Sequence, residues 1–486
     1  ALGIPLTRHL AAGRKPALHL GIPPATTVKC GATAKRLAQS VLVTASRLCY
    51  NLLQPSPLHS DDRKEVDMRI RSITIGTPVS YPVVEEPFHA YGRFQAHARQ
   101  AFEAAQLPVQ TVRLATQPFP EILAQEGPTL AGPFARRMET LCQSHGIDYC
   151  SIGPVAATQP DPEADDLAYV DAIPALIRQT ETVFASVAVA ARASGINLIA
   201  IARAARIVNE IAHSTPDGFG NLRLAILANC EPGTPFFPAA FHRGPTPSFS
   251  IATEAADLAV EAFAGAATLE EARTALRQAV EEAAQVITAV AHRLEAEFDL
   301  PFAGIDFSMA PYPETGRSIG HAIERLGVGT FGGSGTLFAV ALITGVLREA
   351  RFPRCGFSGL FLPVLEDRTL AQRSIEHRYT LDSLLLYSTV CGTGLDTIPL
   401  PGDVSDEEIA AILLDVATLA LVADKPLTAR LMPIPGKRAG EMTEFDFSYF
   451  ANAAVLHTKD CGVPSILAHN SFYRLIRPDA PAGERA

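Results

Sequence analysis

From Met68 onward, short apolar runs rich in β-branched residues alternate with longer stretches of helical periodicity. This alternation constrains the fold more than any other feature of the chain. Runs this short and this apolar are typical of strands buried on both faces. The predicted strands are Arg69–Ile75, Gln110–Ala115, Ile147–Ile152, Leu222–Leu227, Ser248–Ala252, Pro301–Ser308, Phe357–Val364 and Leu427–Ile434. The alternation therefore predicts a mostly parallel sheet covered by helices.

Capping signals place two of the helices between these strands. Thr268 with Glu271 predicts a capping box that opens a long helix to about Phe298, and Ser405 with Glu408 repeats the pattern. Further helices are predicted at 167–194, 199–213, 253–264, 316–326, 336–349 and 366–377. Eight or more strands in about 400 residues fit a large α/β barrel better than a small open sheet.

Composition and charge exclude several classes of protein. Apolar residues make up 48% of the 486 residues and charged residues 19%, which is a globular balance. The net charge of −10 argues against nucleic acid or an anionic membrane surface as the main partner. Eight cysteines without paired spacing do not form a disulfide scaffold. A soluble cytoplasmic protein is expected.

The first part of the chain differs from the rest. Residues 1–60 hold seven Lys or Arg and no Asp or Glu. Such a segment resembles an organelle transit peptide, but a wrongly extended start, with translation beginning at Met68, is the preferred interpretation. The expected organisation is a non-core extension over 1–67, a single α/β barrel domain over 68–460 and a C-terminal tail over 461–486.

Two predicted loops carry candidates for acid–base chemistry. His242 lies in a proline-rich loop after the strand that ends at Leu227, where it could transfer protons or bind an anion. The alternative is a loop histidine bonded to a backbone carbonyl. Asp306 ends an apolar strand and points the same way as Ser308, so it is a catalytic candidate. Its alternative role is to cap the turn that follows.

A glycine cluster opens the helix predicted at 336–349. Its G-x-G-x-x-G pattern follows a predicted helix rather than a strand, so the dinucleotide interpretation fails. Backbone amides at a helix start, with Ser334 or Thr336 as the cap, favour an anionic group. A tight helix–helix turn is the alternative. The residues grouped as ligand-binding here are Gly332, Gly333, Ser334, Gly335 and Thr336.

The glycine-rich loop Ser388–Asp403 holds Cys391, the best nucleophile candidate if something lowers the pKa of its thiol. A small buried cysteine is the alternative. Cys391, His242 and Asp306 are thus the catalytic candidates. No metal site is predicted, because the Cys142–His145–Cys150 spacing has no second ligand pair.

Further charged residues complete the predicted ligand-binding set. Arg430 lies in a strand and Lys437 follows a Pro-Gly pair, and together they could hold a carboxylate or a phosphate. Asp396 belongs to the Cys391 loop. Glu366 and Asp367 follow another strand, although they could instead start the next helix.

These loops carry a resemblance. The segments His242–Gly244, Asp306–Pro313, Gly332–Thr336, Ser388–Asp403 and Thr428–Gly440 resemble the domain-of-unknown-function 711 family, over nearly everything from Met68 to about Lys459. The resemblance implies an α/β barrel of about ten strands, similar to pyruvate formate-lyase-like enzymes. The glycyl-radical signature of those enzymes is absent. By analogy with them, Cys391 would sit on a loop inside the barrel.

Two functions remain open at this point. One is an enzyme, of no assigned reaction class, that acts on a small anionic carboxylate or phosphate metabolite through the cysteine-bearing loop. The other is a non-catalytic metabolite-binding or regulatory protein that uses the same pocket. No cofactor is predicted. A homodimer is compatible with a barrel of this size and its apolar helices.

Overall fold

The computed structural model describes residues 68–158, 164–459, 462–469 and 472–475. The predictions for residues 1–67 and for most of the tail lie outside these residues. The strands are β1 (Arg69–Gly76), β2 (Val109–Ala115), β3 (Tyr149–Ala156), β4 (Val183–Ala191), β5 (Gly195–Asn197), β6 (Leu224–Ala228), β7 (Ser248–Glu254), β8 (Phe302–Asp306), β9 (Gly394–Pro401), β10 (Leu427–Ile434) and β11 (Phe472–Tyr473). All eleven belong to one sheet.

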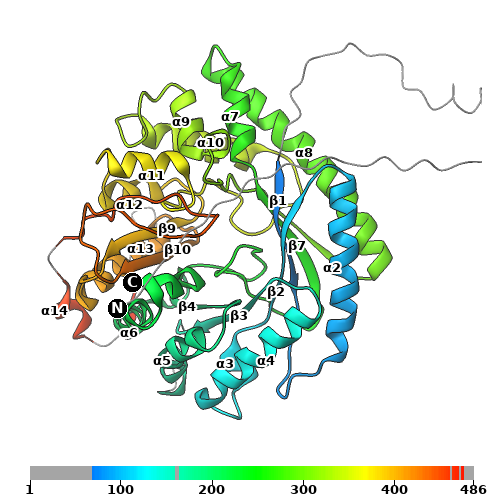
Figure 1. Cartoon of the computed structure of the whole chain (residues 1–486), viewed down its shortest axis with the longest axis vertical. Helices are drawn as coiled ribbons and strands as arrows, with labels where there is room; N and C mark the ends of the chain where they lie inside the picture. The colour runs from blue at the N-terminus through cyan, green and yellow to red at the C-terminus, as the bar shows by residue number, and fades with distance from the viewer. Residues whose placement is uncertain (1–67, 159–163, 460–461, 470–471, 476–486) are drawn as a thin grey trace, which may run out of the picture. The chain divides into compact units, whose positions relative to one another are not determined.

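Helices separate most of these strands in sequence. They are α2 (Glu86–Ala104), α3 (Phe119–Ile122), α4 (Ala131–Ser144), α5 (Ala164–Arg178), α6 (Leu198–Ser214), α7 (Ala256–Ala264), α8 (Leu269–Phe298), α9 (Ile319–Arg325), α10 (Thr336–Glu349), α11 (Arg368–Ile375), α12 (Leu381–Ser388), α13 (Asp406–Val422) and α14 (Pro464–Leu467). Figure 1 shows the longer helices on the outside of the strands. No helix within the described ranges is long and apolar enough to cross a bilayer.

The sheet consists of two parallel halves that run in opposite directions. The order β8-β7-β1-β2-β3-β4-β6-β10-β9 holds the main strands. Strands β1, β2, β3, β4 and β6 pair in parallel, as do β7 with β8 and β9 with β10. The halves meet at two antiparallel pairs, β1 with β7 and β6 with β10. Each mouth of the structure therefore collects the carboxyl ends of one half and the amino ends of the other.

The segment 354–363 closes the ring between β8 and β9. It forms isolated parallel bridges from Arg354 to Ile305 and from Leu360 to Met309 on one side. On the other side Pro363 bridges to Asp396 in β9. The segment thus takes the tenth position of a closed α/β barrel, so the fold class predicted from the strand–helix alternation is confirmed.

Asp306, at the end of β8, anchors this closing segment. Its buried carboxylate accepts hydrogen bonds from the backbone N–H of Phe357 (2.7 Å) and Ser358 (2.6 Å) and from the Ser308 hydroxyl (2.6 Å). Gly356 has a φ of +59°, and a Cβ there would lie 2.1 Å from Asp306 Oδ2. Only glycine therefore fits where the chain passes over this carboxylate.

The connection between the two halves, residues 229–247, is here named the inner loop. Ser72 and Thr74 of β1 donate to the carbonyl oxygen of Pro235 (3.3 and 2.9 Å), and Ser151 of β3 donates to that of Ala240 (2.7 Å). These hydroxyls point into the barrel, since they alternate with apolar side chains that face the helices. The inner loop therefore runs through the inside of the ring.

The structure corrects three sequence predictions within the confirmed fold. The helix predicted at 167–194 ends at Arg178, and Val183–Ala191 is strand β4. Its alanine-rich apolar run has no clear period, so period alone does not separate helix from strand. The predicted loop Ser388–Asp403 contains strand β9. The predicted strand Phe357–Val364 makes only isolated bridges, because positive φ at Ser358 (43°) interrupts the ladder.

Barrel closure yields a stability prediction for Asp306. In Asp306→Asn, an NH₂ group replaces one carboxylate oxygen and faces a donor, so the free energy of unfolding should fall by about 2–3 kcal/mol. Urea denaturation measures this change. Asp403→Asn, an exposed aspartate, is the matched control and should change little. Equal stability of Asp306→Asn and the parent protein would contradict the anchoring role.

Candidate functional site: a charged cavity in the barrel mouth

A cavity of about 90 Å³ lies in the mouth where β7 and β8 end and where β1 and β3 begin. The inner loop contributes Phe236 and Phe237 to its lining. It has room for roughly six to nine water molecules, or for one small organic molecule. The lining residues are Arg71, Gln110, Thr111, Arg113, Tyr149, Phe184, Leu222, Phe236, Phe237, Ala310, Pro311, Phe361, Pro363, Glu366, Asp396, Arg430, Phe447 and Tyr449.

Irregularities in two strand pairings lie at charged lining residues. The register between β1 and β7 shifts between Ile70 and Ser72, so Arg71 is the extra residue of a bulge. The register between β9 and β10 shifts across Asp396 and Thr397. Bulges re-aim side chains, which explains how Arg71 reaches the cavity although its neighbour Ser72 also points inward. Thr397 has a φ of 44°, a strained conformation for a β-branched residue.

A chain of five alternating charges lies at the cavity, and all of its members except Glu254 line it. Arg71 donates to Glu254 (3.0 Å) and to Glu366 (2.5 Å). Arg430 donates to the other oxygen of Glu366 (2.6 Å) and to Asp396 (2.7 Å). All five side chains are buried or nearly so. Buried charges are stable only when paired and hydrogen-bonded, so each member holds the others in place.

The pKa of Glu366 reflects this pairing. Burial alone raises the pKa of a carboxyl group, but Arg430 and Arg71 outweigh it and hold the pKa of Glu366 below its ordinary value. Burial lowers the pKa of Arg71, but the carboxylates of Glu366 and Glu254 outweigh it and raise that pKa above its ordinary value. Glu366 is therefore a fixed anion shared by two guanidinium groups.

Arg113 of β2 stands apart from this chain. Its side chain is buried, and its Nε donates to the hydroxyl of Thr111 (2.8 Å). Its guanidinium lies over the rings of Phe237 (5.1 Å) and Tyr149 (5.7 Å). No residue of the described ranges accepts a hydrogen bond from its two terminal nitrogens. Burial, and then the charge of Arg71, lower the pKa of Arg113 to about 9.

Three sequence-predicted residues meet at this cavity: Arg430, Asp396 and Glu366. Lys437 does not line it and instead pairs with Glu444 (3.0 Å). Asp367 is also elsewhere, because its carboxylate caps α11 through the N–H groups of Thr369 and Leu370. Of the pair that could have started a helix, Glu366 thus belongs to the cavity and Asp367 to the helix.

The other predicted residues lie away from this cavity. His242 Nε2 is 3.0 Å from the carbonyl oxygen of Gly244, as in the backbone-bonded alternative, and Asp306 holds the closing segment. The glycine cluster Gly332–Thr336 is mostly exposed at the start of α10. The predicted cap is wrong, because Gly335 takes the N-cap position without a side-chain bond.

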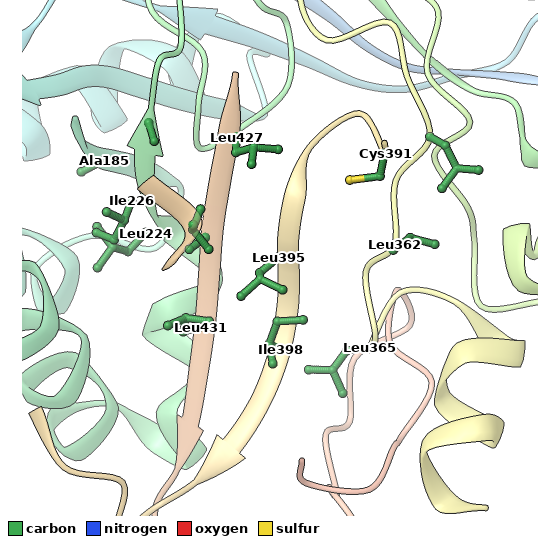
Figure 2. Packing of buried hydrophobic residues seen from close by; sticks show 14 of the residues in the cluster. Ala185, Leu224, Ile226, Leu362, Leu365, Cys391, Leu395, Ile398, Leu427 and Leu431 are labelled. Carbon is green, nitrogen blue, oxygen red and sulfur yellow. The ribbon is translucent and has the colours of Figure 1, made fainter. Parts of the chain in front are cut away.

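Cys391 does not line the cavity either. It is 1% exposed in the turn before β9, and its sulfur accepts the N–H of Gly394 (3.3 Å). Figure 2 shows it in the same buried cluster as Leu362 and Leu395. The loop inside the barrel is the inner loop, and the residues that it contributes to the cavity are Phe236 and Phe237 rather than a cysteine.

Sequence reasoning missed Arg71, Arg113, Glu254 and Tyr149. The available signal was a charged residue within a run predicted to be buried on both faces, as at Arg71 and Arg113. That signal was used for Arg430 alone. Glu254 and Tyr149 lie at strand ends, where polar residues are common and do not by themselves indicate a functional site.

Comparison with known proteins assigns the chain to a family. The family described as "Uncharacterised ACR (DUF711)" matches residues 64–452. The chain belongs to the DUF711 family. A UPF0210 protein of Pyrobaculum arsenaticum is 31% identical to this DUF711 chain over 424 residues, covering 83% of the chain and 93% of the relative. One of Desulforudis audaxviator is 30% identical, covering 79% and 89%.

A solved structure also matches this DUF711 chain. An anaerobic ribonucleotide reductase has a TM-score of 0.34 and 12% identity, over 76% of this chain and 71% of that one. At this TM-score the likeness is too weak to assign fold or function. The closed barrel stands on the strand pairing described above.

The shared role of Glu366 leads to a pH-dependent stability prediction. Glu366→Gln removes the anion between Arg71 and Arg430, so it should cost about 3 kcal/mol at pH 7. Because the folded pKa lies below the ordinary value of 4.5, Glu366 stabilises the fold above that pH and loses this contribution as pH falls through its lowered pKa.

Denaturant titrations of the parent and Glu366→Gln from pH 7 to pH 3 test this sign. The stability difference should be largest near neutral pH and should shrink in acid. Glu444→Gln, which removes a surface ion pair, is the control and should stay within about 0.5 kcal/mol. A difference that grows in acid would contradict the proposed ion-pair chain.

The burial of Cys391 gives a labelling prediction. Native protein treated with iodoacetamide at pH 8 should leave Cys391 unmodified, because the reagent cannot reach a thiol that is 1% exposed. Denaturant should expose it fully. Peptide mass spectrometry distinguishes the two states. Rapid native labelling of Cys391 would restore its candidacy as a nucleophile.

Proposed function

We propose that this protein binds a small carboxylate monoanion with an apolar body in the barrel-mouth cavity. The observation that carries the proposal is Arg113, a buried guanidinium without a carboxylate partner whose terminal nitrogens are unused by the described residues. A buried cation of this kind is costly unless an anion completes it. A planar guanidinium fork matches a carboxylate in a bidentate pair.

The charges around the cavity support a monoanion. Arg71, Arg430 and Arg317 are paired with Glu254, Glu366 and Asp396, so three cations face three anions. Arg113 therefore offers one uncompensated positive charge. A dianion such as phosphate would add a second negative charge beside Glu366 and Asp396, both of which line the same cavity.

The walls support an apolar body. Phe184, Phe236, Phe237 and Phe361 line the cavity together with the ring of Tyr149. Phe237 and Tyr149 also flank the Arg113 guanidinium, so they would shield its bond to a carboxylate from water. Pockets for small metabolites combine apolar walls with a few placed polar groups in this way.

Of the two functions that the sequence leaves open, metabolite binding without chemistry has the better support. Cys391, His242 and Asp306 were the groups expected to supply a nucleophile and proton transfers, and none of them lines the cavity. Glu366 and Asp396 do line it, but both are held in ion pairs by arginines. An enzymatic role would need a proton carrier that is not committed in this way.

The proposal predicts a specific loss of anion binding. Calorimetric titration with sodium benzoate should detect one site, and Arg113→Met should weaken it by about 10- to 100-fold. Arg113→Lys keeps the positive charge but loses the planar guanidinium fork. Its affinity for benzoate should therefore lie between that of the parent protein and that of Arg113→Met. Arg93→Met, an exposed arginine of α2, is the matched control and should bind as the parent does.

Competing anions sharpen this test. Acetate should bind more weakly than benzoate because it covers less of the apolar wall. Inorganic phosphate at pH 8 should not displace benzoate. Equal binding of benzoate by Arg113→Met and Arg93→Met, or stronger binding of phosphate than of benzoate, would contradict the proposal.

A further inference from the structure

The start of α2 and the end of α4 bring three metal-ligating side chains together, away from the cavity. Glu85 and His89 are four residues apart, and Glu85 already has helical backbone angles (φ −81°, ψ −27°), so both lie on one face of the helix. His145 follows the last residue of α4. A Cβ at Gly92 would lie 3.2 Å from His145 Cβ, so the glycine permits this close approach of α4 to α2.

The spacing of the ligand atoms suits a tetrahedral cation. His145 Nε2 lies 3.2 Å from His89 Nδ1. Two imidazole nitrogens bound to one tetrahedral Zn²⁺ lie about 3.3 Å apart, given Zn–N bonds of about 2.05 Å. One ligand atom of each of the three side chains, including a carboxylate oxygen of Glu85, lies within 4.8 Å of the others.

The backbone orients His145 for such a role. Its Nδ1 lies 2.9 Å from the carbonyl oxygen of Leu141, one turn earlier in α4. Donation to this carbonyl places the proton on Nδ1 and leaves the lone pair of Nε2 directed at His89. Metal-binding histidines commonly use a carbonyl in this way to fix the ring and the tautomer.

We propose that Glu85, His89 and His145 form a site for a divalent transition metal, with Zn²⁺ as the best match. Two imidazoles and one carboxylate leave a fourth position for water. The metal would link α2 to α4 on the outside of the barrel. The site shares only His145 with the Cys142–His145–Cys150 spacing, because Cys142 and Cys150 are buried and are not among the clustered ligands.

Arg137 provides a way to distinguish this site from a chance histidine pair. Its guanidinium lies 3.1 Å from Glu85, and both side chains are about half exposed (44% and 48%). A metal must compete with Arg137 for the carboxylate. Arg137→Gln removes this competition together with a nearby positive charge, so it should tighten Zn²⁺ binding, and if Glu85 is a ligand it should do so by less when Glu85 is also changed to Gln.

Calorimetric titration of the full chain without a histidine tag, using Zn²⁺ alone, tests the proposal. His89→Ala and His145→Ala should each weaken the site by about tenfold or more, Glu85→Gln should weaken it less, and Arg137→Gln should tighten it about threefold. His97→Ala, another exposed histidine of α2, is the matched control and should not change it.

Co²⁺ gives a second readout, because a tetrahedral site shows intense visible absorption bands that His145→Ala should abolish. Circular dichroism checks that each variant is folded. If a histidine variant does not fold, the variants of the exposed residues Glu85 and Arg137 still test the proposal. Zn²⁺ binding that is absent, or that survives both histidine variants unchanged, would overturn the proposal.

Discussion

The structure depends on one constraint: every polar group inside the barrel needs a hydrogen-bond partner. A ring with ten strand positions encloses more space than the inward side chains of its strands fill. Residues 229–247 occupy that space, and an irregular loop in a dry interior needs hydrogen-bond partners. Inward hydroxyls of β1 and β3 provide them at Pro235 and Ala240. The inner loop thus requires small polar residues on these strands, because their hydroxyls bond its backbone carbonyl groups.

The same constraint shapes the cavity that the inner loop helps to line. Arg71 and Arg430 are buried with Glu254, Glu366 and Asp396, and the carboxylates satisfy them from both sides. A network of this kind resists change, since removing one member leaves another charge unpaired. Arg113 is the member of the group that forms no ion pair with any of the described residues. The proposed ligand is the partner that this arrangement lacks.

Much of the fold could be predicted because it rests on local pattern. The runs at β1, β2, β7 and β10 are strands, and the Ser405 and Glu408 capping box opens α13 as expected. The site was harder to predict from the sequence. Arg430 was predicted from a charge within a strand, and Glu366 and Asp396 from acids in loops, while the catalytic interpretation of Cys391 depended on its glycine-rich loop and on an analogy with the loops of other barrels. The loop that enters the barrel is a different one, and no local signal distinguishes the two.

The sequence by itself determined the strand–helix alternation, the class of fold and the positions of several charged residues, because hydrophobic period and capping act over a few residues. Only the tertiary structure decided which charges meet. Arg71, Glu366 and Arg430 come from distant parts of the chain, and they meet because antiparallel halves place amino ends of some strands beside carboxyl ends of others. Strand order and the bulge at Arg71 are properties of long-range pairing, on which periodicity within one strand carries no information.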